Sequence, residues 1–375
     1  MSDPSERVPG YRQIRMTVPA GPEAVRADEE AWAARESHPV ILGAGGPVFG
    51  VAREREEGGW ELCGYYGERA PQDARDTMAV HFRRKACEIE SAGGPAAAAR
   101  ECLKAAERLD WEVIDELTVL GSRYRVVRAE RFIRTGPDGP EPPRPSDPDP
   151  AEPGASHELP RSTEGFVLDT VNPTGMSEGI LKAELLSLVL EPGTVPRAVR
   201  DESVRAARTH PGGVLLPVTF VIAERVDGDW QPLTSGSDTP QGARDALTMD
   251  LRVMAPVLRR LDEREREEYA RAADRFDTER GAELYVADRH FRVVRVESLI
   301  RFGPDGPEGP RPSDPDPQPP VMVHDRQLRE QGVITGEEDE DEHEPPEEVK
   351  EMMVLVDKER ERRKRLEESR RRGSA

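Results

Sequence analysis

The sequence predicts an α+β fold of two tandem homologous domains, each a small antiparallel sheet with two or three helices, related by pseudo-two-fold symmetry. This prediction depends on an internal repeat and on the alternation of strand-like and helix-like patterns within each copy. The length of 375 residues suits two or three domains, which leaves room for both copies and a tail.

The repeat is clearest at residues 125–150 and 292–317. These segments read RVVRAERFIRTGPDGPEPPRPSDPDP and RVVRVESLIRFGPDGPEGPRPSDPDP, and 21 of the 26 positions are identical. Weaker upstream matches have an offset that falls from 174 (Ala24 to Ala198) to 167 (Arg125 to Arg292), as small loop deletions in copy two would produce. The predicted divisions are a disordered N-terminus (1–10), copy one (11–170), a linker (171–184), copy two (185–336) and a tail (337–375).

Both copies follow one order of elements. Copy one predicts a strand at 11–18, a helix at 23–36, a β-hairpin over 48–66, helices from Pro71 and Pro95, and a closing strand at 123–134. Copy two predicts the matching helix at 196–209 and a hairpin with Asp227–Gly228 in its turn. After each closing strand, GPDGP predicts a tight turn and PRPSDPDP an extended, polyproline-like segment.

The tail differs in character from both copies. Residues 337–348 form an acidic run, which predicts disorder. The chain beyond this run has a weak apolar stripe and predicts a charged, solvent-exposed helix with a basic stretch at 358–372. Because the whole chain carries a net charge of −20, we expect contact with nucleic acid only through this stretch, if at all.

The composition argues against several classes of protein. No run of 18 apolar residues occurs, so no membrane-spanning segment is predicted. The N-terminus lacks the apolar core of a signal peptide, and three cysteines are too few for a disulfide framework. We therefore expect a cytoplasmic protein.

The strongest polar pattern lies on the two closing strands. Arg128, Glu130 and Arg134 alternate along one face of the first strand, and Arg295, Glu297 and Arg301 repeat the pattern in the second. Arginine can present paired donors to a carboxylate or phosphate. We expect this face to be open to solvent and, if it binds a ligand, to bind an anion.

A second pattern predicts a possible polar pocket. His38 and His210 each precede a proline, and Asp76 and Asp245 each lie in the first turns of a predicted helix. A histidine that meets a carboxylate in a closed pocket would favour catalysis, although the bland interpretation is local turn and helix-start hydrogen bonding. The sequence contains no metal-binding or phosphate-loop motif, so we predict no catalytic, metal-binding or cofactor-binding residue and no cofactor.

The repeated text also carries a resemblance. The duplicated motif GPDGPExPRPSDPDP resembles that of an uncharacterised domain-of-unknown-function family from high-GC actinobacteria. The resemblance covers 11–170 and 185–336 but not the tail. That family has no established activity, so the resemblance implies no catalytic residues.

The preferred hypothesis is a binding or scaffolding protein. It would use a groove between the repeats, or a sheet face, for a small anionic ligand or a protein partner. One alternative is an enzyme whose site lies in that groove. Another is a regulator that contacts nucleic acid through its basic C-terminal helix.

Overall fold

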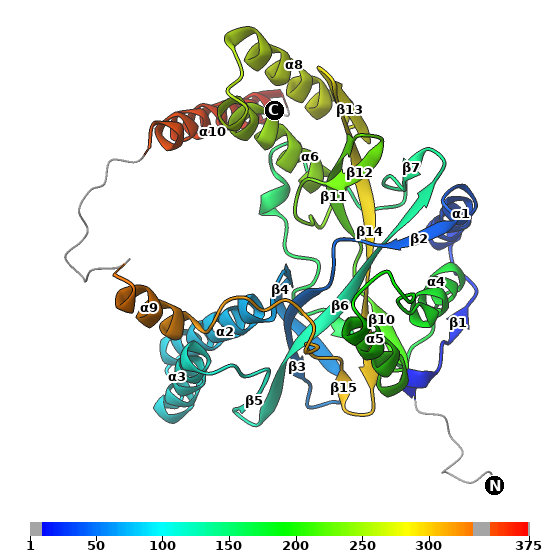
Figure 1. Ribbon diagram of the computed structural model, residues 1–375, viewed down its shortest axis with the longest axis vertical. Helices are drawn as coiled ribbons and strands as arrows, with labels where there is room; N and C mark the ends of the chain where they lie inside the picture. Colours follow the sequence, from blue (N-terminus) through cyan, green and yellow to red (C-terminus); the bar gives the residue numbers. More distant parts are fainter. Residues whose placement is uncertain (1–9, 333–345, 374–375) are drawn as a thin grey trace.

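The computed structural model describes residues 10–332 and 346–373 and has a mixed α+β fold (Figure 1). The N-terminus that we predicted to be disordered lies outside the described residues except for Gly10, and so does most of the acidic run. Within the described residues, no helix is long and apolar enough to cross a membrane.

The helices and strands have the following bounds. The helices are α1 Pro22–Ser37, α2 Pro71–Ser91, α3 Ala96–Trp111, α4 Met176–Ser187, α5 Arg197–Thr209, α6 Pro240–Met249, α7 Ala255–Leu258, α8 Glu263–Glu279, α9 Val321–Glu330 and α10 Glu347–Gly373. The strands are β1 Met16–Thr17, β2 Val40–Gly43, β3 Val48–Glu54, β4 Trp60–Glu68, β5 Glu116–Val119, β6 Ser122–Gly136, β7 Gly139–Pro140, β8 Val167–Leu168, β9 Thr174–Gly175, β10 Gly212–Leu215, β11 Thr219–Val226, β12 Asp229–Pro232, β13 Glu283–Val286, β14 Arg289–Gly303 and β15 Gly306–Pro307.

One antiparallel sheet runs through both sequence copies in the order β12-β11-β14-β6-β3-β4-β8. The long strands β6 and β14 meet at its centre, where Arg131 lies opposite Ser298 and Glu130 lies opposite Leu299. We predicted a separate small sheet in each copy. The two sets of strands instead join through β6 and β14, so hydrogen bonds continue from one copy into the other.

Most of the predicted elements of copy one are present, but the strand at 11–18 is wrong. Met16–Thr17 is a two-residue strand, and Gly10–Arg12 is a turn of 3₁₀ helix. Pairing with β9 reaches only Met16 and Thr17, and a strand extends only as far as a neighbour pairs with it. The predicted linker also holds an element that we missed, since α4 begins at Met176.

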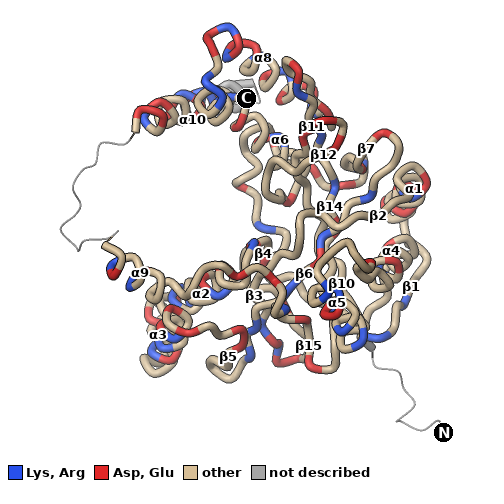
Figure 2. Tube along the Cα trace, viewed as in Figure 1, with Lys and Arg blue, Asp and Glu red and all other residues tan. Residues whose placement is uncertain are grey.

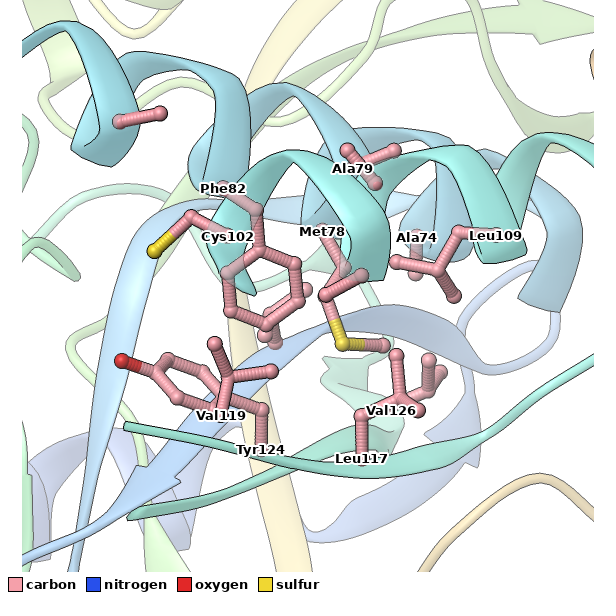
Figure 3. Packing of buried hydrophobic residues seen from close by; sticks show 14 of the residues in the cluster. Ala74, Met78, Ala79, Phe82, Cys102, Leu109, Leu117, Val119, Tyr124 and Val126 are labelled. Atoms are coloured by element: carbon pink, nitrogen blue, oxygen red, sulfur yellow. The ribbon is translucent and has the colours of Figure 1, made fainter. Parts of the chain in front are cut away.

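Helices cover the outer parts of the sheet. In copy one, α2 and α3 pack their apolar faces on β5 and β6, so that Met78 and Phe82 lie over Tyr124 and Val126 (Figure 3). Copy two builds a matching core from α6 and α8 against β11 and β14. This leaves the middle of the same sheet face, around the β6–β14 junction, to be covered by other segments.

Two extended segments cross that middle. The first arm is residues 141–150 and the second arm is residues 308–317. Asp149 of the first arm accepts hydrogen bonds from the Gln241 backbone amide at 2.8 Å and from Arg244 at 2.7 Å, at the start of α6. The first arm therefore binds the N-terminal turn of a helix in the other copy, where a carboxylate is favoured.

The second arm makes the matching contacts in the opposite direction. Asp316 accepts hydrogen bonds from the Gln72 backbone amide at 2.9 Å and from Arg75 at 2.6 Å, at the start of α2. The repeated PRPSDPDP text therefore encodes reciprocal contacts between the two copies, in which the second aspartate of each segment, Asp149 or Asp316, accepts hydrogen bonds at the start of a helix.

The GPDGP turns are also close contacts between copies. Gly139 has a φ of +110°, and a Cβ there would lie 2.4 Å from Trp230 Nε1. Gly306 has a φ of +111°, and a Cβ there would lie 2.6 Å from Trp60 Nε1. Only glycine combines this backbone conformation with this closeness to an indole ring.

The tail helix α10 is present, as predicted, but it is not wholly solvent-exposed. It packs against the π-helical turn Asp250–Met254 and α7. Glu359 is 4% exposed and lies beside Arg252, Arg362 and Arg363. The docked position places the nearly buried carboxylate of Glu359 among three arginines, so its charge is compensated where solvent cannot reach it.

Candidate functional site

The six charged residues of the predicted anion face are buried or half-buried. Arg301 is 2% exposed, Arg134 6%, Arg128 7% and Glu297 8%. Our expectation of a face open to solvent is therefore wrong for these side chains. The arms and the neighbouring helices cover the strand face that the alternation of residues had identified, so the charges pair with one another and with the covering segments.

Three arginines surround Glu130, and with it they form the Glu130 cluster. Arg128, Arg301 and Arg311 approach its carboxylate at 3.1, 3.3 and 3.0 Å. Burial alone would raise the pKa of Glu130, but the guanidinium groups of Arg311, Arg301 and Arg128 lower it below its ordinary value. We call this cluster closed because all three arginines contact the central carboxylate. Arg301 also donates hydrogen bonds to the carbonyls of Leu186 and Leu188.

A second cluster surrounds Glu297 and contains Arg295, Arg134 and Arg144, which we call the Glu297 cluster. Arg295 is ion-paired with Glu297 and lies 3.1 Å from Asp147 of the first arm. Burial would lower the pKa of Arg295, but Glu297 and Asp147 raise it above its ordinary value. This arginine therefore stays charged.

The other two arginines of the Glu297 cluster turn away from Glu297. Arg134 donates to Glu184 of α4 at 2.7 Å, and Arg35 of α1 shares that carboxylate at 2.5 Å. Arg144 donates to Glu141 of its own arm at 2.6 Å. In the part of the chain that the structure describes, each of these two side chains thus has one carboxylate partner, and that partner is not Glu297.

The two clusters differ although their residues match in sequence. At the offset of 167, Arg134 corresponds to Arg301 and Arg144 corresponds to Arg311. Both arginines of the Glu130 cluster contact its central carboxylate, whereas in the described residues neither Arg134 nor Arg144 is ion-paired with Glu297. The side chains that match in sequence are therefore arranged differently around the two carboxylates.

A cavity of about 640 Å³ lies beside Glu297, and Arg134 and Arg144 are among its lining residues. Its walls come from α1, α4 and the segment 215–218, with residues of β6 and β14 at its base. The charged lining residues are Arg35, Arg134, Arg144, Arg295, Asp28, Glu178 and Glu297. The larger apolar lining residues are Val18, Trp32, Phe166, Ile180, Leu181, Leu215, Leu216 and Val218.

Helix α1 forms one wall of the cavity mainly with small side chains. Ala24, Ala27, Ala31 and Arg35 recur at helical spacing and line the cavity, and the small alanines leave space for a ligand. Asp28, on the same side, accepts a hydrogen bond from the Ser177 backbone amide at 2.9 Å and so fixes the start of α4. The contact holds the two walls together.

Glu178 lies on the α4 wall with its side chain exposed to the cavity. Surrounding protein raises the pKa of its carboxyl above the ordinary value, an effect that Lys182 opposes and Glu297 reinforces. The two carboxyls therefore lie within electrostatic range of each other.

The structure does not assemble the predicted polar pocket. His38 and His210 follow the last residues of α1 and α5, and their Nδ1 atoms lie 2.9 Å from the hydroxyls of Ser37 and Thr209. Among the described residues, no hydrogen bond or ion pair joins either histidine to Asp76 or Asp245. The local interpretation therefore describes the histidines best.

The two aspartates make contacts of their own. Asp76 accepts from Gln72 at 2.8 Å, within α2. Asp245 accepts from the Gly154 backbone amide at 2.8 Å and from the Ser156 hydroxyl at 2.6 Å, which holds the chain beyond the first arm. Within the described ranges, no group of three or more histidine, cysteine, aspartate or glutamate side chains is arranged to hold a metal ion.

Three of the six strand residues, Arg134, Arg295 and Glu297, line the cavity, and the other three belong to the closed Glu130 cluster. The sequence analysis missed Arg144 and Glu178. Arg144 lies in the repeated text, where its match to Arg311 was visible. Glu178 had no such signal because it lies in the predicted linker.

The acidic and basic residues of the surface helices are interspersed along α1, α8 and α10 (Figure 2). In α10, Arg362 donates to Asp277 at 3.0 Å and Arg363 donates to Glu359 at 3.0 Å. These two members of the basic stretch 358–372 are therefore engaged with the protein itself.

Comparison with known proteins gives a family but no activity. The search of curated proteins and the search of solved structures returned no match. The model of DUF5954, described as a family of unknown function, matches residues 21–317, which include both arms, both charged clusters and most of the cavity lining. The chain therefore belongs to the DUF5954 family.

Proposed function

We propose that this protein binds a small molecule, and that the cavity over the Glu297 cluster is its binding site. The ligand carries an anionic group, such as a carboxylate, and an apolar part. The observation that carries this proposal is the separation of Arg134 and Arg144 from Glu297, at the place where the matching arginines close on Glu130.

The size and lining of the cavity support a small ligand. Small-molecule sites typically enclose roughly 300–1,000 Å³ and combine apolar walls with a few polar groups. A volume of about 640 Å³ lies within that range. A concave site also favours a small ligand over the flat surface of a protein partner.

Arg134 and Arg144 are the groups that we assign to the anion. Each keeps donors beyond its one carboxylate contact, because a guanidinium group has five N–H donors. Arg35 and Arg134 share the single carboxylate of Glu184, so two positive charges face one negative charge there. A ligand carboxylate would balance it.

We also propose that the protein arose by duplication and that an approximate two-fold axis passes beside the Arg131–Ser298 pair. Those two residues match in the repeat and lie opposite each other in the sheet. The reciprocal binding of Asp149 and Asp316 supports this relation. In this proposal one of two equivalent clusters has opened to form a site.

We further infer a cytoplasmic location and, from the resemblance in the repeated motif, an actinobacterial origin.

The test is calorimetric titration of the full-length protein with hexanoate at pH 7. We expect a dissociation constant of about 1 mM, which corresponds to about 4 kcal/mol for a ligand of this size. Arg134→Gln and Arg144→Gln should each weaken binding by about tenfold, because each removes a charge-assisted hydrogen bond.

Two further variants separate a lost contact from a misfolded protein. Ala31→Leu adds bulk to the cavity wall without removing a charge and should also abolish binding. Arg197→Gln changes a side chain that is 92% exposed on α5 and should leave binding unchanged. The proposal is wrong if hexanoate does not bind, or if Ala31→Leu and Arg144→Gln bind it as the unmodified protein does.

A further inference from the structure

We infer that the ligand of this cavity is zwitterionic, with an ammonium group near Glu297 and Glu178 as well as a carboxylate near Arg134 and Arg144. An amino acid with an aliphatic side chain has this chemistry. The inference rests on the proposed small-molecule site and goes further, because it assigns a second, cation-binding pole to the same cavity.

The first argument is the incomplete pairing of Glu297. Glu130 receives three arginines, whereas among the described residues only Arg295 is ion-paired with Glu297. A buried carboxylate is most stable when its lone pairs are filled by donors. A ligand ammonium group would supply the donors that Arg301 and Arg311 supply to Glu130.

The second argument is that backbone geometry does not explain the difference. Arg301 is two residues beyond Leu299, which lies opposite Glu130, and Arg134 has the same diagonal relation to Glu297. Such diagonal neighbours are about 7–8 Å apart, and Arg301 spans this separation to reach Glu130. Arg134 could do the same, but Glu184 of α4 holds it away.

The third argument is the lining of the α4 wall. Glu178 faces the same cavity, and in the described residues it is in no ion pair. Partial removal from water raises the pKa of its carboxyl, and Lys182 offsets this effect only in part. A cation placed between Glu178 and Glu297 would relieve their mutual repulsion and compensate the buried charge of Glu297.

The two poles and the apolar walls fit one molecule. Glu297 of β14 and Arg134 of β6 are diagonal neighbours across the strand pair, a relation that typically separates residues by about 7–8 Å. Leu181 and Trp32 are among the apolar residues that line the same cavity. A ligand with adjacent ammonium and carboxylate groups can contact both poles and place its aliphatic chain against these residues.

The experiment compares three probes by calorimetry on the full-length protein at pH 7: norleucine, hexanoate and pentylamine. We expect norleucine to bind at least about tenfold more tightly than either single-charge probe, because only norleucine contacts both poles. Glu178→Gln should weaken norleucine binding by about fivefold or more and leave hexanoate binding unchanged or tighter. Glu29→Gln, an exposed change elsewhere on α1, is the matched control and should alter neither.

The outcomes separate this inference from the proposed function. If hexanoate binds as tightly as norleucine, or if Glu178→Gln changes both equally, the ligand is a simple anion and the cation pole is wrong. If pentylamine alone binds, the cavity is a cation site and the assigned anion pole is wrong. If none of the probes binds, both the proposed site and its zwitterionic ligand are wrong.

Discussion

Replacing Asp149 with alanine tests whether the arms hold the two copies together. Asp149 accepts hydrogen bonds from the Gln241 backbone amide at 2.8 Å and from Arg244 at 2.7 Å, and it forms an ion pair with Arg280 at 3.1 Å. Loss of the helix-start hydrogen bond costs about 1 kcal/mol, and loss of the charged bond to a nearly buried arginine costs about 2 kcal/mol. We therefore expect Asp149→Ala to lower the free energy of unfolding by about 3 kcal/mol.

The corresponding change in the second arm should have a smaller effect. Asp316→Ala also removes a helix-start hydrogen bond, but Arg75 keeps a second carboxylate, Asp115, at 2.8 Å. Within residues 10–332 and 346–373, Arg244 would keep only the neutral oxygens of Gly281 and Gln241 as hydrogen-bond partners. We expect a loss of about 2 kcal/mol for Asp316→Ala, because its arginine partner does not become an unpaired buried charge.

The assay is urea unfolding of the full-length protein, followed by tryptophan fluorescence and circular dichroism. Asp138→Ala is the control, since Asp138 is exposed in the GPDGP turn and has no ion pair among the described residues. Its unfolding free energy should stay within about 0.5 kcal/mol of the unmodified protein. If Asp149→Ala is no less stable than Asp138→Ala, the arms do not stabilise the fold in the way described.

Three other predictions test separate parts of the structure. Gly306→Ala should lower the unfolding free energy by about 3 kcal/mol or more in urea, because its φ is +111° and a Cβ would meet Trp60; equal stability of Gly306→Ala and the unmodified protein would contradict that packing. Burial, reinforced by Lys85 and Arg84, lowers the pKa of His81 to about 4 from 6.5, so the folded protein binds fewer protons than the unfolded chain between these pH values. Stability should therefore be fully present above about pH 6.5 and fall as the pH drops towards 4, by about 2 kcal/mol more than in His81→Leu; parallel pH profiles for the two proteins would rule this out. Burial raises the pKa of the Cys63 thiol to about 11, and Cys102 is 0% exposed, so iodoacetamide at pH 7.5 should modify exposed Cys87 at least about tenfold faster than either, as followed by mass spectrometry.

Local patterns predicted the elements with clear periodicity. The spacing of Met78, Phe82 and Ala86 gave α2, and those residues are buried in the core of copy one. The alternation around Arg128 and Arg134 gave the strand β6 and the face on which both lie. The prediction that this face is exposed to solvent was wrong. Alternation shows which residues share a face, but not which other segments cover that face.

The covering segments could not be predicted because their contacts are non-local. Asp149 accepts a hydrogen bond from the backbone amide of Gln241, which lies 92 residues further along the chain, and no local pattern connects the two residues. Helix α4 was missed because the linker around Met176 lacks a match in the second copy. Glu184 of that helix binds Arg134 of the cavity lining, so the repeat alone could not predict the proposed site.

The most direct test of the account is a crystal structure of the full-length protein grown with norleucine. The account predicts the ligand carboxylate within hydrogen-bond distance of Arg134 or Arg144 and the ammonium group within hydrogen-bond distance of Glu178 or Glu297. A structure in which Arg134 and Arg144 close on Glu297, as Arg301 and Arg311 close on Glu130, with no ligand between them would contradict it.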